Sequence, residues 1–577
     1  VRGGGPHQNL ILMDGMNVYE ASHLGGLSSI FLPGAIKYIN FHKDAFPARY
    51  GGRVSSVLDV RLKDGNRQEF ERQLSMGLEG IMGRFDGPVS KRLSVNMNVR
   101  TTWFDDLAGP LVQRNTSIES LDMGYSDAFA KLTWWLSPGS RISGSAYWGE
   151  DIIKLVINSS PVNFTGFQDL NRISWGNRMA SLKWETVIGD QFFVKLQSGI
   201  SSYDYNSRGS YEFEFEENGM PSQRAFDILS VSSISDHKIS GELDYYSNKY
   251  GQFKIGAQYI DNLNRPSIEE SNNFASEPET VPLSDTSYHS REMAIYFENS
   301  LSLGTDLNFI SGLRWSNYYT GSNHFSYLEP RLRLQFDFVN SSVGISYSRI
   351  SQFIHLLSNP GPGLPSDLWV PSTSRLAPEL SDNFSIEYSA HFKSFSWGAS
   401  LWYKSFDNLV EYENPSDIIY SIIIDNELYQ VEVNNDNWEE RISSGGGYAT
   451  GIELYSSMSY KSLNLRLNYG YSRSFRQFNE LNGGNRFPFR YDQPHQASAL
   501  MQWKFNEYAQ LRMHWQFATG FAYSLSNTER LGADGQPVLV PSSRNNFRLP
   551  DFHHLDISYE HRFVMDNSIV KLNMGVY

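Results

Sequence analysis

The densest run of groups able to do chemistry is an acidic stretch from Asp407 to Glu440. It contains ten Asp or Glu residues and no Lys or Arg. Carboxylate oxygens are hard ligands, so this stretch could bind Ca²⁺, bridge to lipopolysaccharide or attract a cationic ligand. A solvated acidic loop explains the same composition, and the spacing does not match a helix-loop-helix calcium site. The sequence therefore predicts no metal site here.

Two adjacent histidines, His553 and His554, invite a metal-binding interpretation as well. Successive side chains of a strand point to opposite faces, so the two rings cannot share one ion. None of the 13 His residues lies in a Gly-x-Ser-x-Gly context, the strained turn that presents a nucleophilic serine. The sequence therefore predicts no catalytic residue and no cofactor, and we expect a protein that is not an enzyme.

The composition of the 577 residues narrows the class of protein. Asp and Glu outnumber Lys and Arg by 63 to 49, a formal net charge of −14, and this deficit of positive charge argues against a nucleic-acid binder. The chain has no Cys, which removes disulfide frameworks and thiolate sites. No apolar run approaches the roughly 18 residues of a membrane-spanning helix, so an integral membrane protein of this sequence would have to be a β-barrel.

The elements that must position any site are strands. From about Arg72 onward, apolar and polar residues alternate with a period of two; in 463–472, for example, Leu and Tyr alternate with Asn, Arg, Gly and Ser. Tight turns alternate along the chain with polar loops of up to about 30 residues, as in outer-membrane barrels. We therefore predict an all-β fold, a transmembrane antiparallel β-barrel of about 21 strands.

An odd number of strands does not fit a single-chain bacterial barrel, in which the number is even. The chain also opens at Val1 without an apolar leader and stops at Tyr577 within an alternating stretch. We interpret the sequence as a fragment of a parent barrel of about 22 strands. An unpaired edge is then expected between the strands near 73–80 and 568–577, and a barrel of this width requires a plug in its lumen.

The first 66 residues have a different residue pattern, with short strand-like runs and Gly-rich turns that match no phosphate-binding loop. They closely resemble the second half of the plug domain of TonB-dependent outer-membrane receptors, of the variety abundant in Bacteroidetes. The stretches that carry the resemblance are VRGGGPHQNLILMDGMNVYEASHLGG and INFHKDAFPARYGGRVSSVLDVRLKDG. Barrel stretches such as GGGYATGIEL (445–454) and NNFRLPDFHHLDISY (545–559) are similar to the same family.

The resemblance implies a division of the chain. Residues 1–66 would form the C-terminal half of a plug and residues 67–577 the transmembrane barrel, with the first half of the plug and the closing strand outside the sequence. It also implies residence in the cell outer membrane, in contact with lipid and lipopolysaccharide.

The function that the resemblance implies is active import of a scarce ligand, such as a siderophore or an oligosaccharide. Energy would come from the TonB complex, which pulls on a box N-terminal to this sequence. A surface lipoprotein is a further candidate partner, and no nucleic acid is expected to bind. The alternative is a passive outer-membrane channel or surface-binding barrel without energy coupling.

In this family two plug cations resemble a lock against two barrel glutamates. Arg2, in an Arg-Gly turn, matches the first cation, whereas Lys43 stands where the second cation is usually an arginine, so the bidentate fork is lost. On the barrel side, Glu387 and Glu453 face inward by the parity of their strands. We predict that they hold Arg2 and Lys43, the alternative being that both are ordinary solvated carboxylates of the lumen.

A ligand-binding cup needs aromatic platforms and a few polar groups. The plug offers Tyr19 and His23, and a predicted extracellular loop offers Trp369. We expect some of these residues to line one cavity above the plug. The alternative is that Trp369 packs its own loop and Tyr19 packs the plug core.

Overall fold

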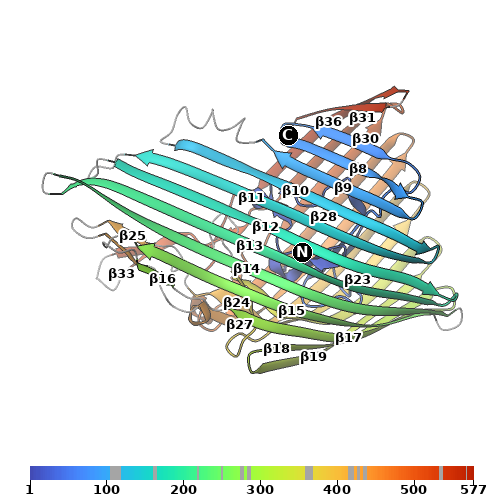
Figure 1. The fold of residues 1–577 in the computed structure, drawn as a ribbon. Coiled ribbons are helices and arrows are strands. Elements are labelled where there is room, and N and C mark those ends of the chain that lie inside the picture. The colour runs from blue at the N-terminus through green and yellow to red at the C-terminus, as the bar shows by residue number, and fades with distance from the viewer. Residues whose placement is uncertain are drawn as a thin grey trace.

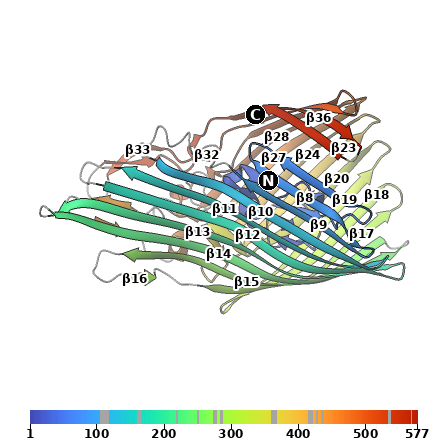
Figure 2. The same cartoon turned by 45° about the horizontal axis from the view of Figure 1, so that its top comes forward.

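The computed structural model describes residues 1–103, 118–159, 166–217, 220–247, 251–272, 279–282, 287–357, 368–413, 421–424, 429–432, 438–531, 537–566 and 568–576. Most of these residues form one closed barrel, the wall, around an N-terminal segment that lies in its lumen (Figure 1, Figure 2). We call residues 1–66 the lumenal segment. Across the described ranges, the helices are all too short to pass through a lipid bilayer.

The wall follows the order of the chain. Its ring has 23 members, of which β16 (Glu279–Pro282) and β29 (Phe487–Pro488) are short inserts, because β15 also pairs with β17 and β28 with β30. In the described part of the chain, 21 wall strands remain, which confirms the predicted barrel. They are β7 (Glu71–Met76), β8 (Gly80–Ser90), β9 (Leu93–Thr102), β10 (Ile118–Ser137), β11 (Ser140–Ser159), β12 (Gly166–Ile188), β13 (Phe192–Glu217), β14 (Met220–Ser247), β15 (Gly251–Asn272), β17 (Tyr288–Leu303), β18 (Leu307–Thr320), β19 (Asn323–Asp337), β20 (Ser341–Gln352), β23 (Glu379–His391), β24 (Phe395–Tyr412), β27 (Ile442–Tyr460), β28 (Leu463–Phe478), β30 (His495–Lys504), β31 (Ala509–Ala518), β36 (Phe552–Met565) and β37 (Ser568–Val576).

The ring closes between its last and first strands. β37 and β7 are hydrogen-bonded neighbours, so the expectation of an unpaired edge near 73–80 and 568–577 is wrong. Both β36–β37 and β7–β8 are antiparallel pairs. Because an odd number of strands alternates in direction around the ring, β37 and β7 run the same way. The junction between them is therefore parallel, in a wall whose other neighbouring strands are antiparallel.

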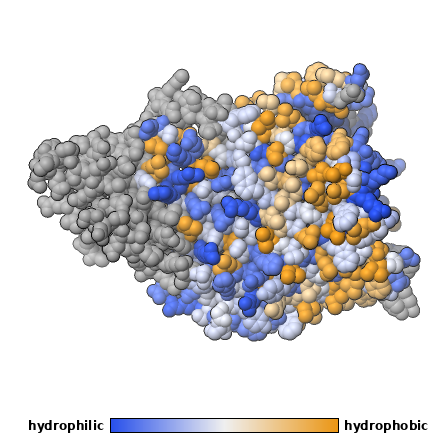
Figure 3. Space-filling model, viewed as in Figure 1, coloured by the Kyte–Doolittle hydropathy of each residue, from blue (hydrophilic) through white to orange (hydrophobic). Residues whose placement is uncertain are grey.

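The alternation of side chains gives the wall an apolar outer band. Trp134, Trp184, Trp397 and Trp503 belong to this outer face, and they are 38–52% exposed. Figure 3 shows apolar surface toward one rim and more polar surface toward the other. The apolar rim is the one with tight turns, such as the two-residue connections between β10 and β11 and between β27 and β28. We call it the turn rim and the opposite one the loop rim.

Additional short elements belong to the connections of the loop rim. The hairpin of β21 (Ile354–Leu357) and β22 (Leu368–Pro371) crosses the lumen, because β22 contacts β14 and β15 whereas β21 contacts β24. We call it the cross-lumen hairpin. The other elements are β25 (Ser421–Ile424), β26 (Tyr429–Glu432), η4 (Trp438–Glu440), η5 (Asn482–Gly484), β32 (Ala522–Tyr523), β33 (Ser526–Leu531), β34 (Pro537–Pro541) and β35 (Phe547–Arg548).

The lumenal segment folds around a small sheet of its own, with strand order β2-β1-β6-β5. β1 and β6 are parallel, and the other two pairs are antiparallel. Apolar side chains of this sheet, such as Met13, Met16 and Val60, form one buried cluster with the wall residues Phe129 and Tyr147. Its elements are η1 (Pro6–Gln8), β1 (Asn9–Met13), β2 (Met16–Asn17), β3 (Ser22–His23), η2 (Leu24–Gly26), β4 (Ser28–Ser29), β5 (Ile36–His42) and β6 (Ser56–Leu62).

Candidate functional site

The first four residues form a tight turn against the wall. The N–H of Gly4 donates to the carbonyl of Val1 at 3.1 Å, and Arg2 and Gly3 have φ angles of 47° and 75°. A Cβ atom on Gly3 would collide with the side chain of Ala449 on β27. Glycine is needed at this position because it tolerates both the positive φ and the close approach. The turn thereby aims Arg2 at the inner faces of β24 and β27.

The guanidinium of Arg2 makes ionic contacts in two directions. Its Nη2 lies 2.7 Å from Oε2 of Glu453 and its Nε donates to Oε1 at 3.1 Å, a bidentate pair. The same Nη2 donates to Oγ of Ser400 at 2.9 Å, and Nη1 pairs with Asp44 of the lumenal segment. The Arg2 side chain is only 2% exposed, so these contacts hold a buried charge.

Lys43 reaches the same wall carboxylate. Its Nζ lies 2.9 Å from Oε2 of Glu453, so one glutamate holds both predicted cations. The Lys43 side chain is 41% exposed. Solvent screens an exposed pair, so we expect Lys43 to contribute less to the attachment than Arg2 does.

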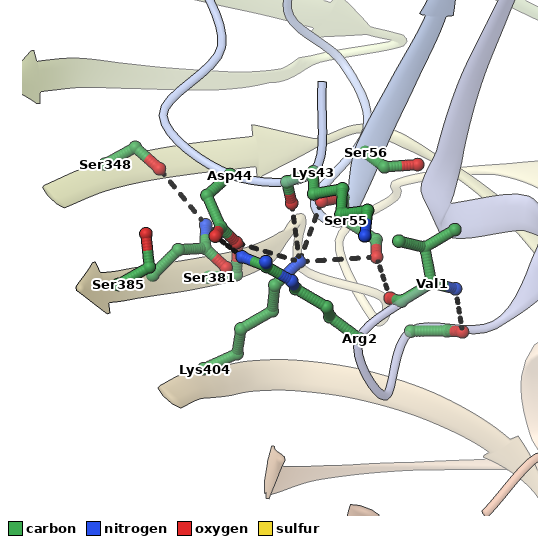
Figure 4. Close-up of polar contacts among 12 residues, drawn as sticks. Val1, Arg2, Lys43, Asp44, Ser55, Ser56, Ser348, Ser381, Ser385 and Lys404 are labelled. Carbon is green, nitrogen blue, oxygen red and sulfur yellow. Dashed lines mark hydrogen bonds and ion pairs between the residues drawn. The ribbon is translucent and has the colours of Figure 1, made fainter. Parts of the chain in front are cut away.

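Two further charged residues, Asp44 and Lys404, complete the site, and neither was predicted from the sequence. Lys404, on the inner face of β24, is fully buried and donates to the main-chain oxygens of Ser55 at 2.8 Å and Lys43 at 3.4 Å. Its Nζ also lies 3.9 Å from Oδ1 of Asp44 (Figure 4). Strand parity could have placed Lys404 inside, but nothing in the sequence indicates that it meets residues about 350 positions earlier. We call Arg2, Lys43, Asp44, Lys404 and Glu453 the ionic cluster.

Glu387 faces the lumen as predicted but does not hold the lumenal segment. Its Oε2 pairs with Nη2 of Arg333 at 2.9 Å, a contact between two wall strands. Gly344 of β20 lies between them, and a Cβ there would lie 3.3 Å from Arg333 and 3.8 Å from Glu387. The absence of a side chain on Gly344 leaves more room for this contact across β20. The prediction that Glu387 binds Arg2 or Lys43 is therefore wrong.

The ionic cluster borders a cavity of about 890 Å³ between the lumenal segment and the wall. The side chains that line its far side are polar, and they include Asn468, Gln496 and Gln516 of β28, β30 and β31. Glu453 lies in the half of β27 nearer the turn rim. Separation of the cluster would therefore widen an existing polar space on that side of the lumen.

Tyr19 and Trp369 meet, but not in an open cup. Their ring centroids are 5.1 Å apart with planes at 73°, and the guanidinium of Arg53 lies 5.3 Å from the Trp369 ring. Trp369 is 5% exposed, and the Tyr19 hydroxyl donates to Oδ2 of Asp236 on β14 at 2.5 Å. Burial raises the pKa of Tyr19 well above its usual value, which keeps this donor protonated. Tyr19 and Trp369 therefore do not line the expected cavity above the plug, because their rings pack against each other where the cross-lumen hairpin meets the lumenal segment.

His23 is also buried, and it bridges two carboxylates of the wall. Its Nε2 lies 2.8 Å from Oδ1 of Asp127 and its Nδ1 lies 2.8 Å from Oδ2 of Asp151. The ring stacks on Tyr125 with centroids 4.2 Å apart. Burial lowers the pKa of His23, but the hydrogen bonds to the two carboxylates outweigh it and the net pKa is raised. His23 is thus an ionic tie to the wall, not an exposed ligand platform.

The raised pKa of His23 predicts a pH dependence. The attachment that this charge provides is complete below the ordinary pKa of about 6.5 and is lost as the pH rises through the raised value. We expect a spin label at Leu27, which is 59% exposed, to become more mobile in the full-length protein as the pH rises from about 6.5 through the raised pKa of His23. His23→Gln should remove this pH response, and an equal response in the variant would contradict the assignment.

Lys131 of β10 makes a third ionic tie, to the opposite end of the sheet of the lumenal segment. Its Nζ lies 2.9 Å from Asp14 and 3.0 Å from Asp64, and it donates to the carbonyl of Leu62 at 3.0 Å. Burial raises the pKa of Asp14, but the charges of Lys131 and Lys183 outweigh it, so the net pKa is lowered. The lumenal segment is therefore held by charges on several sides of the lumen.

Comparison with known proteins bears on what this arrangement does. The sequence profile of a family described as "TonB dependent receptor-like, beta-barrel" matches residues 102–577. No curated protein sequence matches the chain. The matched family and the structures below are transport receptors rather than enzymes.

Three solved structures illustrate the likeness in fold. P. aeruginosa FpvA bound to heterologous pyoverdines is 11% identical, with a TM-score of 0.67 over 99% of this chain and 76% of that one. The siderophore receptor PirA from Acinetobacter baumannii is 13% identical, with a TM-score of 0.62 over 98% and 85%. The ferric enterobactin receptor PfeA from Pseudomonas aeruginosa is 14% identical, with a TM-score of 0.62 over 100% and 85%. At these identities the likeness establishes a shared fold.

Proposed function

The chain belongs to the TonB-dependent receptor β-barrel family, and on that premise we propose that it imports a scarce ligand, such as a ferric siderophore or an oligosaccharide, across the outer membrane. In this proposal residues 1–66 belong to the plug, residues 67–577 form the transmembrane barrel, and the TonB complex supplies the force that moves the plug. The family's fold implies the outer membrane. Outer-membrane lipid and lipopolysaccharide would contact the wall, and a surface lipoprotein is a further candidate partner.

The observation that carries the proposal is the ionic cluster beside the lumenal cavity. A single wall carboxylate, Glu453, holds two cations of the lumenal segment, and about 890 Å³ of polar space adjoins the contact. Charged groups regain hydration when they separate, so a contact of this kind can open and re-form without exposing an apolar surface. This is the property that a plug moved by an external force requires.

The cluster also supports a direction of opening. Arg2 and Lys43 lie at one edge of the lumenal segment, whereas His23 and the partners of Lys131 lie against β10 and β11. Loss of the cluster would therefore free the edge that borders the cavity and leave the segment attached elsewhere. A partial displacement of this kind would widen the lumen on the side of β27, β28 and β30.

The competing function, a passive channel, predicts a different conductance. We expect the full-length receptor to show no steady current in a planar bilayer in KCl, because the lumenal segment is tied to the wall on several sides. An open porin in the same bilayer serves as the positive control. A steady current through the unmodified receptor, without TonB, would favour the passive channel.

A further inference from the structure

A second large cavity lies on the outside of the barrel. It has a volume of about 470 Å³ and is formed by β24, β27, β28 and the connection after β28. Tyr403 and Tyr448 line it, whereas the neighbouring Trp402 and Ala449 are buried on the lumenal face. We call this outer cavity the Gly446 groove, after the residue at its floor.

The groove lies at the border of the apolar band that is nearer the loop rim. From the turn rim upward, the outward residues of β24 are apolar as far as Leu401, which is 52% exposed. They continue with Tyr403, Ser405 and Asp407, all of which line the groove. The neighbouring strand β27 changes in the same way above Ile452, which is 44% exposed. This is the level at which the headgroups of the outer leaflet meet a barrel wall.

Local backbone structure creates the groove. β24 has a bulge between Phe406 and Leu409, with Asn408 at a φ of 56°, and it lies opposite three successive glycines of β27. A Cβ on Gly446 would have only the carbonyl of Phe406 within 4 Å, at 3.3 Å, so any larger side chain there would extend into the groove. The bulge places two residues of β24, Asp407 and Asn408, opposite the single residue Gly446. Asp407 keeps the outward direction of Tyr403 and Ser405; it is exposed and has no side-chain hydrogen bond or ion pair within the described ranges.

One wall of the groove is aromatic and cationic. The rings of Tyr403 and Tyr448 are 6.3 Å apart at 23°, and those of Tyr448 and Phe475 are 5.6 Å apart. The guanidinium of Arg486 lies 4.7 Å from the Phe475 ring, and its Nη1 donates to the Tyr448 hydroxyl at 2.5 Å. Among the described residues, Arg486 has no carboxylate within 4.0 Å. Its charge is therefore held in place by two aromatic residues and left without a counter-ion.

We propose that the Gly446 groove binds the phosphorylated sugar headgroup of a glycolipid of the outer leaflet. The ring faces offer a platform for a sugar, the unpaired guanidinium of Arg486 suits a phosphate, and Asp407 accepts hydrogen bonds from hydroxyls. The acyl chains of the same molecule would lie along the apolar residues below, such as Leu401 and Ile452. The inference rests on the proposed function only in requiring that the wall spans the outer membrane.

Another outward cation of the wall provides a control. Arg178 of β12 points outward with a side chain 61% exposed, and it lies 3.9 Å from the carboxylate of Asp204. This neighbouring negative charge makes it a poor phosphate ligand compared with Arg486. Replacing either arginine by Gln removes one positive charge from the outer wall, so a nonspecific electrostatic effect would be the same in both variants.

The test is retention of glycolipid by the full-length receptor purified in detergent from outer membranes. We expect native mass spectrometry to find about one glycolipid per wild-type barrel and about tenfold weaker retention in Arg486→Gln, the factor for losing one charge-assisted hydrogen bond. Gly446→Val, which fills the groove without removing a charge, should lower retention similarly, and Arg178→Gln should match the wild type. Heat-modifiable electrophoretic migration checks that each variant is folded.

Several outcomes would overturn the inference. Full retention in Arg486→Gln would do so even if Gly446→Val failed to fold, as would equal losses in Arg486→Gln and Arg178→Gln. Displacement of the glycolipid by a soluble glucosamine phosphate at similar concentration would show that the groove takes a free sugar phosphate and not a membrane lipid. Retention does not depend on transport, so a barrel that keeps its glycolipid but fails to import would contradict the proposed function alone.

Discussion

Replacing Glu453 by Gln in the full-length receptor is expected to open the barrel. The variant keeps the shape of the side chain but removes the charge that holds Arg2 and Lys43, whose Nη2 and Nζ lie 2.7 Å and 2.9 Å from Oε2. Loss of a charge-assisted contact to a buried guanidinium costs about 2 kcal/mol, which corresponds to a roughly 30-fold larger fraction of released lumenal segment. We expect this release as current in a planar bilayer in KCl and as impaired import in cells, with normal barrel assembly.

Glu387→Gln is the matched control for this experiment. Glu387 lines the same cavity and also loses a charge, but its partner is Arg333 of the wall, so the lumenal segment should stay attached. A closed Glu453→Gln barrel, or equal currents in both variants, would show that the contact with Glu453 does not hold the segment.

Replacing Lys131 by Met is expected to have the larger effect on stability. It removes a buried ammonium that faces two carboxylates, and Asp14, with a side chain 2% exposed, loses its closest cation. Breaking a buried ion pair by removing one partner costs about 3–5 kcal/mol. Native-state hydrogen exchange of β1 and β6 in the full-length receptor should therefore accelerate by at least about a hundredfold, since each 1.4 kcal/mol is a factor of ten.

Two variants sharpen the interpretation of Lys131→Met. Lys154→Met, on β11, removes an ammonium that is 39% exposed and 3.9 Å from Asp122, and it should leave the exchange unchanged. Adding Asp14→Asn to Lys131→Met should restore part of the protection, because the orphaned buried charge is then gone. Unchanged exchange in Lys131→Met would contradict the importance of this tie.

The wall could be predicted from the sequence because its pattern is local. Successive side chains of each strand point to opposite faces, so the outward Trp residues and the inward Glu387 and Glu453 can be predicted from the alternation alone. The number of wall strands could be counted in the same way. The closure of the ring could not, because pairing between β37 and β7 joins the two ends of the barrel sequence and has no local signal.

The contacts inside the lumen were only partly predictable. The family resemblance singled out Arg2 and Lys43, and both do meet Glu453. Parity could not tell which inward glutamate they would meet, because it does not reveal that Glu387 is paired with Arg333 of the wall. Asp44 and Lys404 were missed for a related reason: a buried charge network is defined by three-dimensional proximity of distant segments.

The aromatic residues show a different limit. Tyr19, His23 and Trp369 were proposed as ligand contacts from residue type, but the structure gives each a partner inside the protein. Residue type alone does not distinguish an accessible aromatic ring of a ligand-binding site from one that packs against a neighbouring segment. Here Trp369 of the cross-lumen hairpin packs on Tyr19 of the lumenal segment. Nothing in the sequence indicated that this connection folds across the lumen.

The central claim, that the lumenal segment is a plug moved by TonB, is tested most directly at Ser55. This residue is fully buried beneath Lys404, and residues 1–577 contain no Cys, so the thiol of Ser55→Cys is distinguished by comparing its labelling with that of the unmodified receptor. Labelling by a bulky maleimide is measured in cells that carry the full-length receptor, with and without TonB, during growth on the medium in which the receptor is needed. We predict labelling only when TonB is present and energised. Equal labelling without TonB, or none in either strain, would contradict the account.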